Sequence, residues 1–205
     1  MTLLSADKSI ETERLVLRRI SRDDLPFYSR IHADPDVARY LAHGNPRSHE
    51  ETAAWLEAVV DSYRALELGQ LAITRKSDGA LVGRTGVSHL QTERHPGPDG
   101  TRLGYYFPTP APEGADLITQ AELGYTLERS AWGHGYAREA VSGVWNYLRT
   151  KRPDLLVVSL IHPENTRSIR LATRFGATIA DRITSWDRPY DRYVWPDGNK
   201  PSIER

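Results

Sequence analysis

The residues best suited to chemistry lie in one short segment, where a pair of glycines joins two apolar, periodic stretches. Gly133 and Gly135 follow an alternating run that ends at Leu127, and they precede a helical pattern that begins at Tyr136. Glycine lets the backbone approach a ligand closely, because no side chain stands in the way. The first N–H groups of a helix lack intrahelical acceptors, and the helix dipole favours an anion there. The segment therefore predicts an anion site, for which a diphosphate is the natural ligand.

The glycine pair alone leaves alternatives open. A dinucleotide-binding G-x-G-x-x-G motif would need a third glycine where Arg138 stands, and the pattern G-x-x-x-x-G-K-[ST] is absent. A tight turn without a ligand remains the structural alternative.

Strands and helices on both sides must position this segment. Alternation in Ala121–Leu127 predicts a strand with Ala121, Leu123, Tyr125 and Leu127 on one face. A helix is expected over Tyr136–Thr150, and the continuous apolar run Leu155–Ile161 predicts a buried strand. Further strands are expected at Arg14–Ile20, Leu71–Thr74, Leu81–Leu90, Ala177–Trp186 and Tyr190–Trp195. Further helices are expected after Ser21, from Asp34 to Leu41, from Ser48 through Leu66 to Gly69, and from Asn165 to Gly176.

A single domain is expected to cover residues 1–205, with a core from about residue 11 to about residue 195. Clustered prolines predict a loop insertion over about 91–116, with a short extended piece at Arg102–Phe107. Residues 196–205 are expected to form a frayed tail.

Composition limits the class of protein. The chain has 27 basic and 27 acidic side chains, so no general attraction to nucleic acid or to an anionic membrane is expected. It contains no cysteine, and its seven histidines lack metal-ligand spacing, so no metal site is expected. No segment has the length of a membrane span or the plan of a signal peptide, which predicts a cytoplasmic protein.

Several separated motifs share one order with a known family. They are Glu13–Arg18, Asp34–Val37, the stretch from Ala121 through Trp132-Gly133-His134-Gly135 to Ala137, and His162–Ser168 followed by Gly176. In these motifs the chain resembles the GNAT superfamily of N-acetyltransferases, and within it the branch that acetylates the N-terminal alanine or serine of ribosomal proteins. The resemblance covers about Glu11 to Trp195.

The resemblance implies an α/β (α+β) fold with a mixed, splayed central sheet, helices on both faces, and acetyl-CoA bound at the splay. Leu127 would pair its backbone with the pantetheine arm, and Asn165 would also contact this arm. The loop that would hold the diphosphate consists of Trp132, Gly133, His134, Gly135, Tyr136, Ala137 and Arg138. Trp132 stands where the superfamily often has Arg or Gln, and Ala172 stands where it often has a tyrosine general acid.

Two side chains are candidates for proton transfer. Glu122 lies on the strand before the glycines and is the candidate base, directly or through water; a solvated edge carboxylate or a salt-bridge partner is the alternative. Ser168 is the candidate acid for the CoA thiolate, and its alternative is an exposed position in the helix that Asn165 caps. Glu139 is interpreted as structural, since the dipole of its helix accounts for an acidic residue in the first turn.

The leading hypothesis is an enzyme that moves an acetyl group from acetyl-CoA to a primary amine, with a protein N-terminal α-amine as the favoured acceptor. A small-molecule N-acetyltransferase acting on an antibiotic, a polyamine or an amino acid is the alternative. A non-catalytic acyl-CoA-binding module is a second alternative, motivated by Ala172. Assembly as a homodimer stays open.

Overall fold

The computed structural model describes residues 9–63, 69–106 and 112–196. The strands are β1 (Ile10–Glu11), β2 (Leu15–Arg19), β3 (Gln70–Arg75), β4 (Leu81–Glu93), β5 (Arg102–Tyr106), β6 (Leu117–Leu127), β7 (Val157–Ile161), β8 (Thr178–Ser185) and β9 (Arg188–Val194). The α-helices are α1 (Leu25–His32), α2 (Pro35–Ala38), α3 (His49–Ser62), α4 (Tyr136–Lys151) and α5 (Thr166–Arg174), and the 3-10 turns are η1 (Arg22–Asp24) and η2 (Arg129–Ala131). Two expectations, the helical turn at Leu66 and the tail over 197–205, lie outside the described residues.

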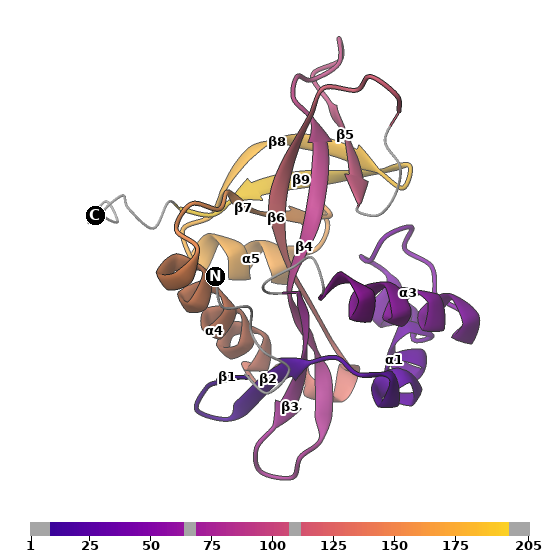
Figure 1. Ribbon diagram of the computed structural model, residues 1–205, viewed down its shortest axis with the longest axis vertical. Coiled ribbons are helices and arrows are strands. Elements are labelled where there is room, and N and C mark those ends of the chain that lie inside the picture. Colours follow the sequence, from indigo (N-terminus) through magenta and orange to yellow (C-terminus); the bar gives the residue numbers. More distant parts are fainter. Residues whose placement is uncertain (1–8, 64–68, 107–111, 197–205) are drawn as a thin grey trace. The chain divides into compact units, whose positions relative to one another are not determined.

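The strands form a nine-stranded mixed sheet in the order β1-β2-β3-β4-β5-β8-β9-β7-β6, and β4 also pairs with β6. The pairs β5–β8 and β6–β7 are parallel, whereas β1–β2, β2–β3, β3–β4, β4–β5, β7–β9 and β8–β9 are antiparallel. Helices flank the sheet (Figure 1), which confirms the predicted fold class.

The chain divides into two compact units, each made from two stretches of sequence. The first unit contains Met1–Val87 and Gly124–Trp145, and the second contains Ser88–Leu123 and Asn146–Arg205. Strands β4 and β6 and helix α4 contribute residues to both units. The two units are therefore described one at a time.

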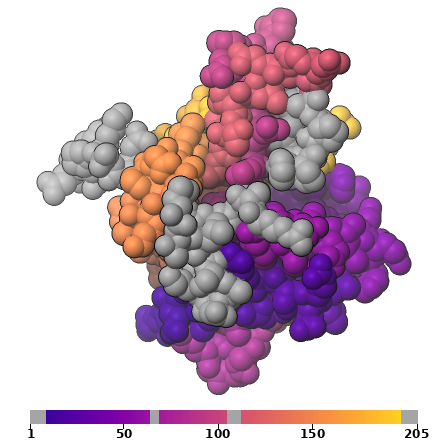
Figure 2. Space-filling model, in the orientation of Figure 1, coloured from indigo at the N-terminus to yellow at the C-terminus, as the bar shows by residue number. Residues whose placement is uncertain are grey.

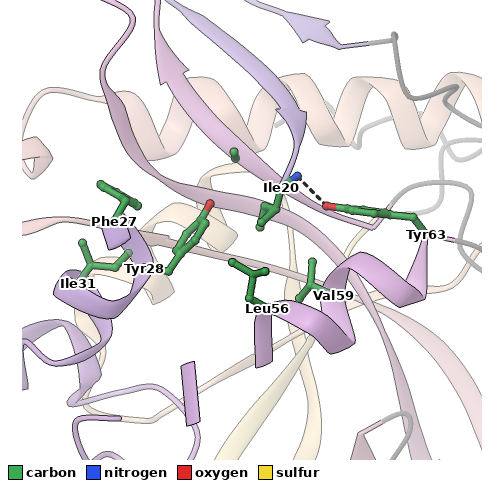
Figure 3. Close-up of a cluster of buried hydrophobic side chains, with 8 residues drawn as sticks. Ile20, Phe27, Tyr28, Ile31, Leu56, Val59 and Tyr63 are labelled. Carbon is green, nitrogen blue, oxygen red and sulfur yellow. Dashed lines mark hydrogen bonds between the residues drawn. The ribbon is translucent and has the colours of Figure 1, made fainter. Parts of the chain in front are cut away.

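In the first unit, α1 and α3 bury an apolar cluster against the sheet (Figure 3). Tyr28 of α1 and Leu56 of α3 are almost fully buried there beside Ala72 of β3. The Tyr63 hydroxyl accepts a hydrogen bond from the backbone N–H of Ile20 at 2.9 Å and donates to the Gln70 carbonyl. These bonds satisfy a phenol that would otherwise be costly to bury.

Helix α3 begins with the predicted capping box. The Ser48 hydroxyl accepts from the Glu51 N–H at 3.1 Å, and the Glu51 carboxylate accepts from the Ser48 N–H at 2.7 Å. Two otherwise unsatisfied donors at the helix start are thereby paired.

The part of α4 that belongs to the first unit lies against β1 and β2. A Cβ atom on Gly143 would stand 3.0 Å from Cγ2 of Thr12, 3.3 Å from Cγ2 of Ile10 and 3.4 Å from Cδ1 of Leu17. Glycine therefore lets α4 lie close to these strands. In this unit α4 covers one face of the sheet, and α1 and α3 cover the other (Figure 1).

In the second unit, a partly buried cluster of charges joins β5, β8 and β9. Asp181 of β8 accepts from Nε of Arg192 at 2.7 Å and from Nε of Arg102 at 2.9 Å. Burial alone would raise the pKa of the Asp181 carboxyl, but the hydrogen bonds and charges of the two arginines lower it below its ordinary value. One carboxylate of β8 thereby links arginines of the two neighbouring strands.

Several boundaries differ from the predictions. Strand β4 continues to Glu93, and β5 pairs with both β4 and β8. Of the loop expected over about 91–116, the described residues without regular structure are therefore 94–101 and 112–116. Strand β7 begins at Val157 rather than Leu155, and Leu156 is 41% exposed. The apolar run is therefore not buried along its whole length. Helix α2 ends at Ala38 rather than Leu41.

The predicted alternation of β6 holds only in part. Ala121 and Leu123 are buried, but Tyr125 is half-buried and both Thr126 and Leu127 are buried. At this point β6 lies close to β4: a Cβ on Gly83 would stand 2.3 Å from the Thr126 carbonyl oxygen and 2.9 Å from Cα of Leu127. Strand β6 also begins at Leu117, earlier than predicted.

The face shown in Figure 2 exposes much of the first unit's N-terminal residues, which are coloured indigo to purple. None of the helices in the described parts of the chain is both long and apolar enough to cross a membrane.

Candidate cofactor and catalytic residues

The glycine segment forms a tight connection between β6 and α4 in the first unit. After β6 the chain makes the 3-10 turn η2, which the glycines follow. Gly133 and Gly135 have φ angles of +82° and +80°, in the left-handed region that disfavours residues with a Cβ atom. The backbone conformation therefore favours glycine at both positions, and glycine also permits the close approach of a ligand.

Backbone donors are available along this connection. Among the described residues, no backbone carbonyl accepts from the N–H groups of Gly133, His134, Tyr136, Ala137 or Arg138. The first regular bond of α4 runs from the Glu139 N–H to the Gly135 carbonyl at 3.1 Å. A Cβ on Gly133 would have no described atom within 4 Å. Free donors beside open space fit the diphosphate of acetyl-CoA.

Side chains of the segment hold its shape. Nε1 of Trp132 donates to the Leu127 carbonyl at 2.9 Å, and Nδ1 of His134 lies 2.9 Å from the Trp132 carbonyl. The His134 ring stacks on the Tyr136 ring with centroids 5.7 Å apart. The predicted backbone pairing of Leu127 with pantetheine must therefore accommodate a carbonyl that already accepts from Trp132.

A network from the turn between β1 and β2 reaches the same segment. Glu139 accepts from the Thr12 hydroxyl and the Arg14 N–H, both at 2.6 Å, and from Nε of Arg14 at 2.7 Å. Nη1 of Arg14 donates to the His134 carbonyl at 3.0 Å. Partial burial would raise the pKa of Glu139, but the bonds from Thr12 and Arg14 lower it. Glu139 thus has specific partners besides the helix dipole.

Arg14 and Thr12 are functional candidates that the sequence did not single out. Arg14 stands in the resemblance motif Glu13–Arg18, but nothing in the spacing shows that it would meet a segment about 120 residues later. The pairing depends on how α4 lies against β1 and β2, which is a tertiary property.

In the second unit, Asn165 and Ser168 stand at the start of α5, as predicted. Asn165 is the N-cap, and its Oδ1 accepts from the Ser168 N–H at 3.2 Å. Ser168 is half-buried, and Ala172 one turn later is buried. The capping role of Asn165 is confirmed, and its contact with pantetheine stays a prediction.

Glu122 is half-buried on β6, opposite Val158 of β7 in the parallel register. The phenol of Tyr190 on β9 is buried, and burial raises its pKa. The Arg188 side chain opposes that rise, and the Glu122 carboxylate adds to it. Tyr190, whose ring lies 6.0 Å from the His162 ring, is a buried phenol within electrostatic range of Glu122 that the sequence did not indicate.

The predicted site residues thus fall into two groups. The first unit brings together Leu127 and the segment from Trp132 to Arg138, and the second unit contains Glu122, Asn165 and Ser168. Within the described residues, no group of three or more His, Asp or Glu side chains is arranged to bind a metal ion.

A family model described as an acetyltransferase (GNAT) domain matches residues 14–178. The chain therefore belongs to the GNAT acetyltransferase family. It is an acetyl-CoA-dependent N-acetyltransferase, which confirms the predicted enzyme class over the non-catalytic module.

Relatives and solved structures cover nearly the whole chain. The uncharacterized protein YkkB of Bacillus subtilis strain 168 is 25% identical over 191 residues, or 93% of this chain and 96% of the relative. An acetyltransferase from Agrobacterium tumefaciens C58 matches in structure with a TM-score of 0.69 at 23% identity, covering 96% of this chain and 98% of that one. A ribosomal-protein-S5-alanine acetyltransferase from Vibrio fischeri matches with a TM-score of 0.64 at 15% identity, covering 95% and 100%. These structures support the GNAT fold.

Proposed function

We propose that this acetyltransferase modifies the α-amine of a protein N-terminus. The observation that carries the proposal is the order of motifs from Glu13 to Ser168, which resembles the branch that acetylates ribosomal-protein N-termini. The similar fold of the Vibrio fischeri ribosomal-protein-S5-alanine acetyltransferase supports it.

In the proposed site, acetyl-CoA supplies an activated acetyl thioester. The N–H groups of the residues from Gly133 to Arg138 would bind its diphosphate, because they lack backbone acceptors among the described residues and adjoin a helix start. Asn165 would contact the pantetheine arm while it caps α5.

Glu122 would accept the proton that the acceptor amine loses as the new N–C bond forms. Ser168 would donate its hydroxyl proton to the thiolate as the C–S bond breaks, and solvent would then restore that proton. Both groups handle protons during the transfer, in line with general acid–base catalysis.

The cost of removing a proton differs between the two kinds of protein amine. At pH 7 an α-amine with a pKa of about 7.7 costs about 1 kcal/mol to deprotonate, whereas a lysine amine near 10.4 costs about 4.6 kcal/mol. Glu122, which is half-buried, would therefore meet a smaller proton-transfer cost with an α-amine than with a lysine amine.

The experiment that tests the proposal is a thiol-release assay with acetyl-CoA and a panel of amines. The panel contains peptides with free N-termini, the same peptides with blocked N-termini, polyamines and aminoglycosides. Turnover that requires the free peptide N-terminus supports the proposal. Turnover only with polyamines or aminoglycosides would support a small-molecule acetyltransferase instead.

A further inference from the structure

The turn before β2 contains an arginine that contacts the predicted diphosphate loop from a distant part of the sequence. The Arg14 guanidinium makes two directed bonds, from Nε to the Glu139 carboxylate at 2.7 Å and from Nη1 to the His134 carbonyl at 3.0 Å. It also lies over the Tyr136 ring, with Cζ 4.8 Å from the ring centroid. One planar group therefore touches the loop, the first turn of α4 and an aromatic ring of the same segment.

The bond to His134 fixes the direction of a neighbouring donor. The His134 carbonyl and the Gly135 N–H belong to one peptide group, which is planar and trans. Because the carbonyl points to Arg14, the N–H must point the opposite way. Among the described residues, no backbone carbonyl accepts from this N–H. A cation on the carbonyl also polarises the peptide and strengthens its N–H as a donor.

Two further bonds to Glu139 hold together the carboxylate and the turn that contains Arg14. Its backbone N–H donates to Oε1 of Glu139 at 2.6 Å, and the Thr12 hydroxyl donates to the same oxygen at 2.6 Å. Nη2 of Arg14 lies 3.5 Å from the place that a Cβ on Gly135 would occupy. The guanidinium thus stands behind Gly135, on the carbonyl side of the loop.

We propose that Arg14 is a positioning residue of the cofactor site: its Nη1 holds the His134 carbonyl so that the Gly135 N–H faces the diphosphate of acetyl-CoA. The inference rests on the proposed binding of the diphosphate at this loop. It assigns a role to a residue that lies outside the glycine motif and that acts through the backbone rather than by touching the cofactor.

Two substitutions separate geometry from charge. Arg14→Met removes both bonds and the charge. Arg14→Lys retains the charge and can still pair with Glu139, but an ammonium lacks the planar fork that reaches two acceptors at once. Arg22→Met is the matched control, because Arg22 forms an exposed ion pair with a different carboxylate, that of Glu57, in the same unit.

We expect both Arg14 variants to bind CoA about tenfold more weakly in calorimetric titrations, since a hydrogen bond to a charged group is lost in each. The KM for acetyl-CoA should rise by a similar factor, with kcat and the acceptor KM unchanged. Arg22→Met should match the wild-type protein. If Arg14→Lys loses less than about threefold, charge alone accounts for the effect and the proposal fails.

A spectroscopic readout tests the orientation of the peptide directly. With 15N-glycine labelling, the Gly135 amide resonance of the free protein should shift in both Arg14 variants and stay in place in Arg22→Met, because the hydrogen bond at the His134 carbonyl polarises that amide. An unmoved Gly135 resonance would overturn the proposal. If the wild-type protein binds no CoA, the proposed function fails, and the Gly135 resonance still decides whether Arg14 orients the loop.

Discussion

Gly133 offers a sharp test of the cofactor loop, because its backbone requires glycine and its surroundings are open. Its φ angle is +82°, and a Cβ would meet no described atom within 4 Å. A valine side chain there would project into the space that the diphosphate is expected to use. We therefore expect Gly133→Val to lose CoA affinity through contact with the ligand and not through a clash inside the protein.

The cost of the substitution to folding can be estimated from the backbone. A left-handed conformation costs a residue with a Cβ about 1–2 kcal/mol, and β-branched valine falls at the upper end. Typical unfolding free energies are about 5–15 kcal/mol, so the variant should fold. For a chain of this size the loss corresponds to a fall in Tm of about 4–8 °C.

Gly79→Val is the matched control for this strain. Gly79 lies in the turn between β3 and β4, has a φ angle of +71° and likewise has no atom within 4 Å of an added Cβ. Both variants should lose similar stability in chemical denaturation, but only Gly133→Val should lose CoA affinity in calorimetry, by at least about tenfold. Wild-type affinity in Gly133→Val, or an equal loss in Gly79→Val, would refute the diphosphate site at this loop.

Three further predictions follow from the same structure. Acetyl-CoA at about one hundred times its Kd should stabilise the fold by about 2.7 kcal/mol, which raises Tm by about 5–11 °C in a thermal shift assay, whereas NADH should leave Tm unchanged. Glu122→Gln should modestly reduce the rate with an α-amine acceptor, and this rate should recover as pH rises. Ser168→Ala should lower kcat at every pH. Wild-type rate–pH profiles in both variants would exclude proton transfer by either residue. Burial, with the charges of Arg84 and Arg47, lowers the pKa of His32 in the folded protein to about 3. In the unfolded chain this imidazole has its ordinary pKa of about 6.5, so between these two pH values unfolding takes up one proton. The unfolding free energy should therefore fall as pH drops from 6.5 towards 3, by up to about 1.36 kcal/mol per pH unit. His32→Leu should remove this part of the dependence of the unfolding free energy on pH, as measured by chemical denaturation. An unchanged dependence would mean that His32 is not held neutral.

Local patterns predicted the glycine turn and two of the helix starts. The glycine pair, the capping box at Ser48 and the N-cap at Asn165 all depend on neighbouring residues, and the structure has each of them where the sequence placed it. Turn and cap chemistry acts within a few residues, so a sequence contains the information needed to find it.

Features that depend on distant partners were predicted less well. The extended piece expected at Arg102–Phe107 is confirmed as strand β5 over Arg102–Tyr106, but its pairing with β4 and β8 depends on distant segments and was not predicted. The close approach of β4 at Gly83 to the backbone of Thr126 and Leu127 also joins segments far apart in the sequence. Likewise, the bonds from Arg14 to Glu139 and His134 exist only because α4 lies against β1 and β2.

The most direct test of the proposed function is to locate the acetyl group on a reacted peptide. A peptide with a free N-terminus and an internal lysine is incubated with acetyl-CoA and the protein, and the product is sequenced by tandem mass spectrometry. The account predicts an acetyl group on the N-terminal nitrogen and an unmodified lysine. Acetylation confined to the lysine, or no acetylation of any peptide while a small amine reacts, would contradict it.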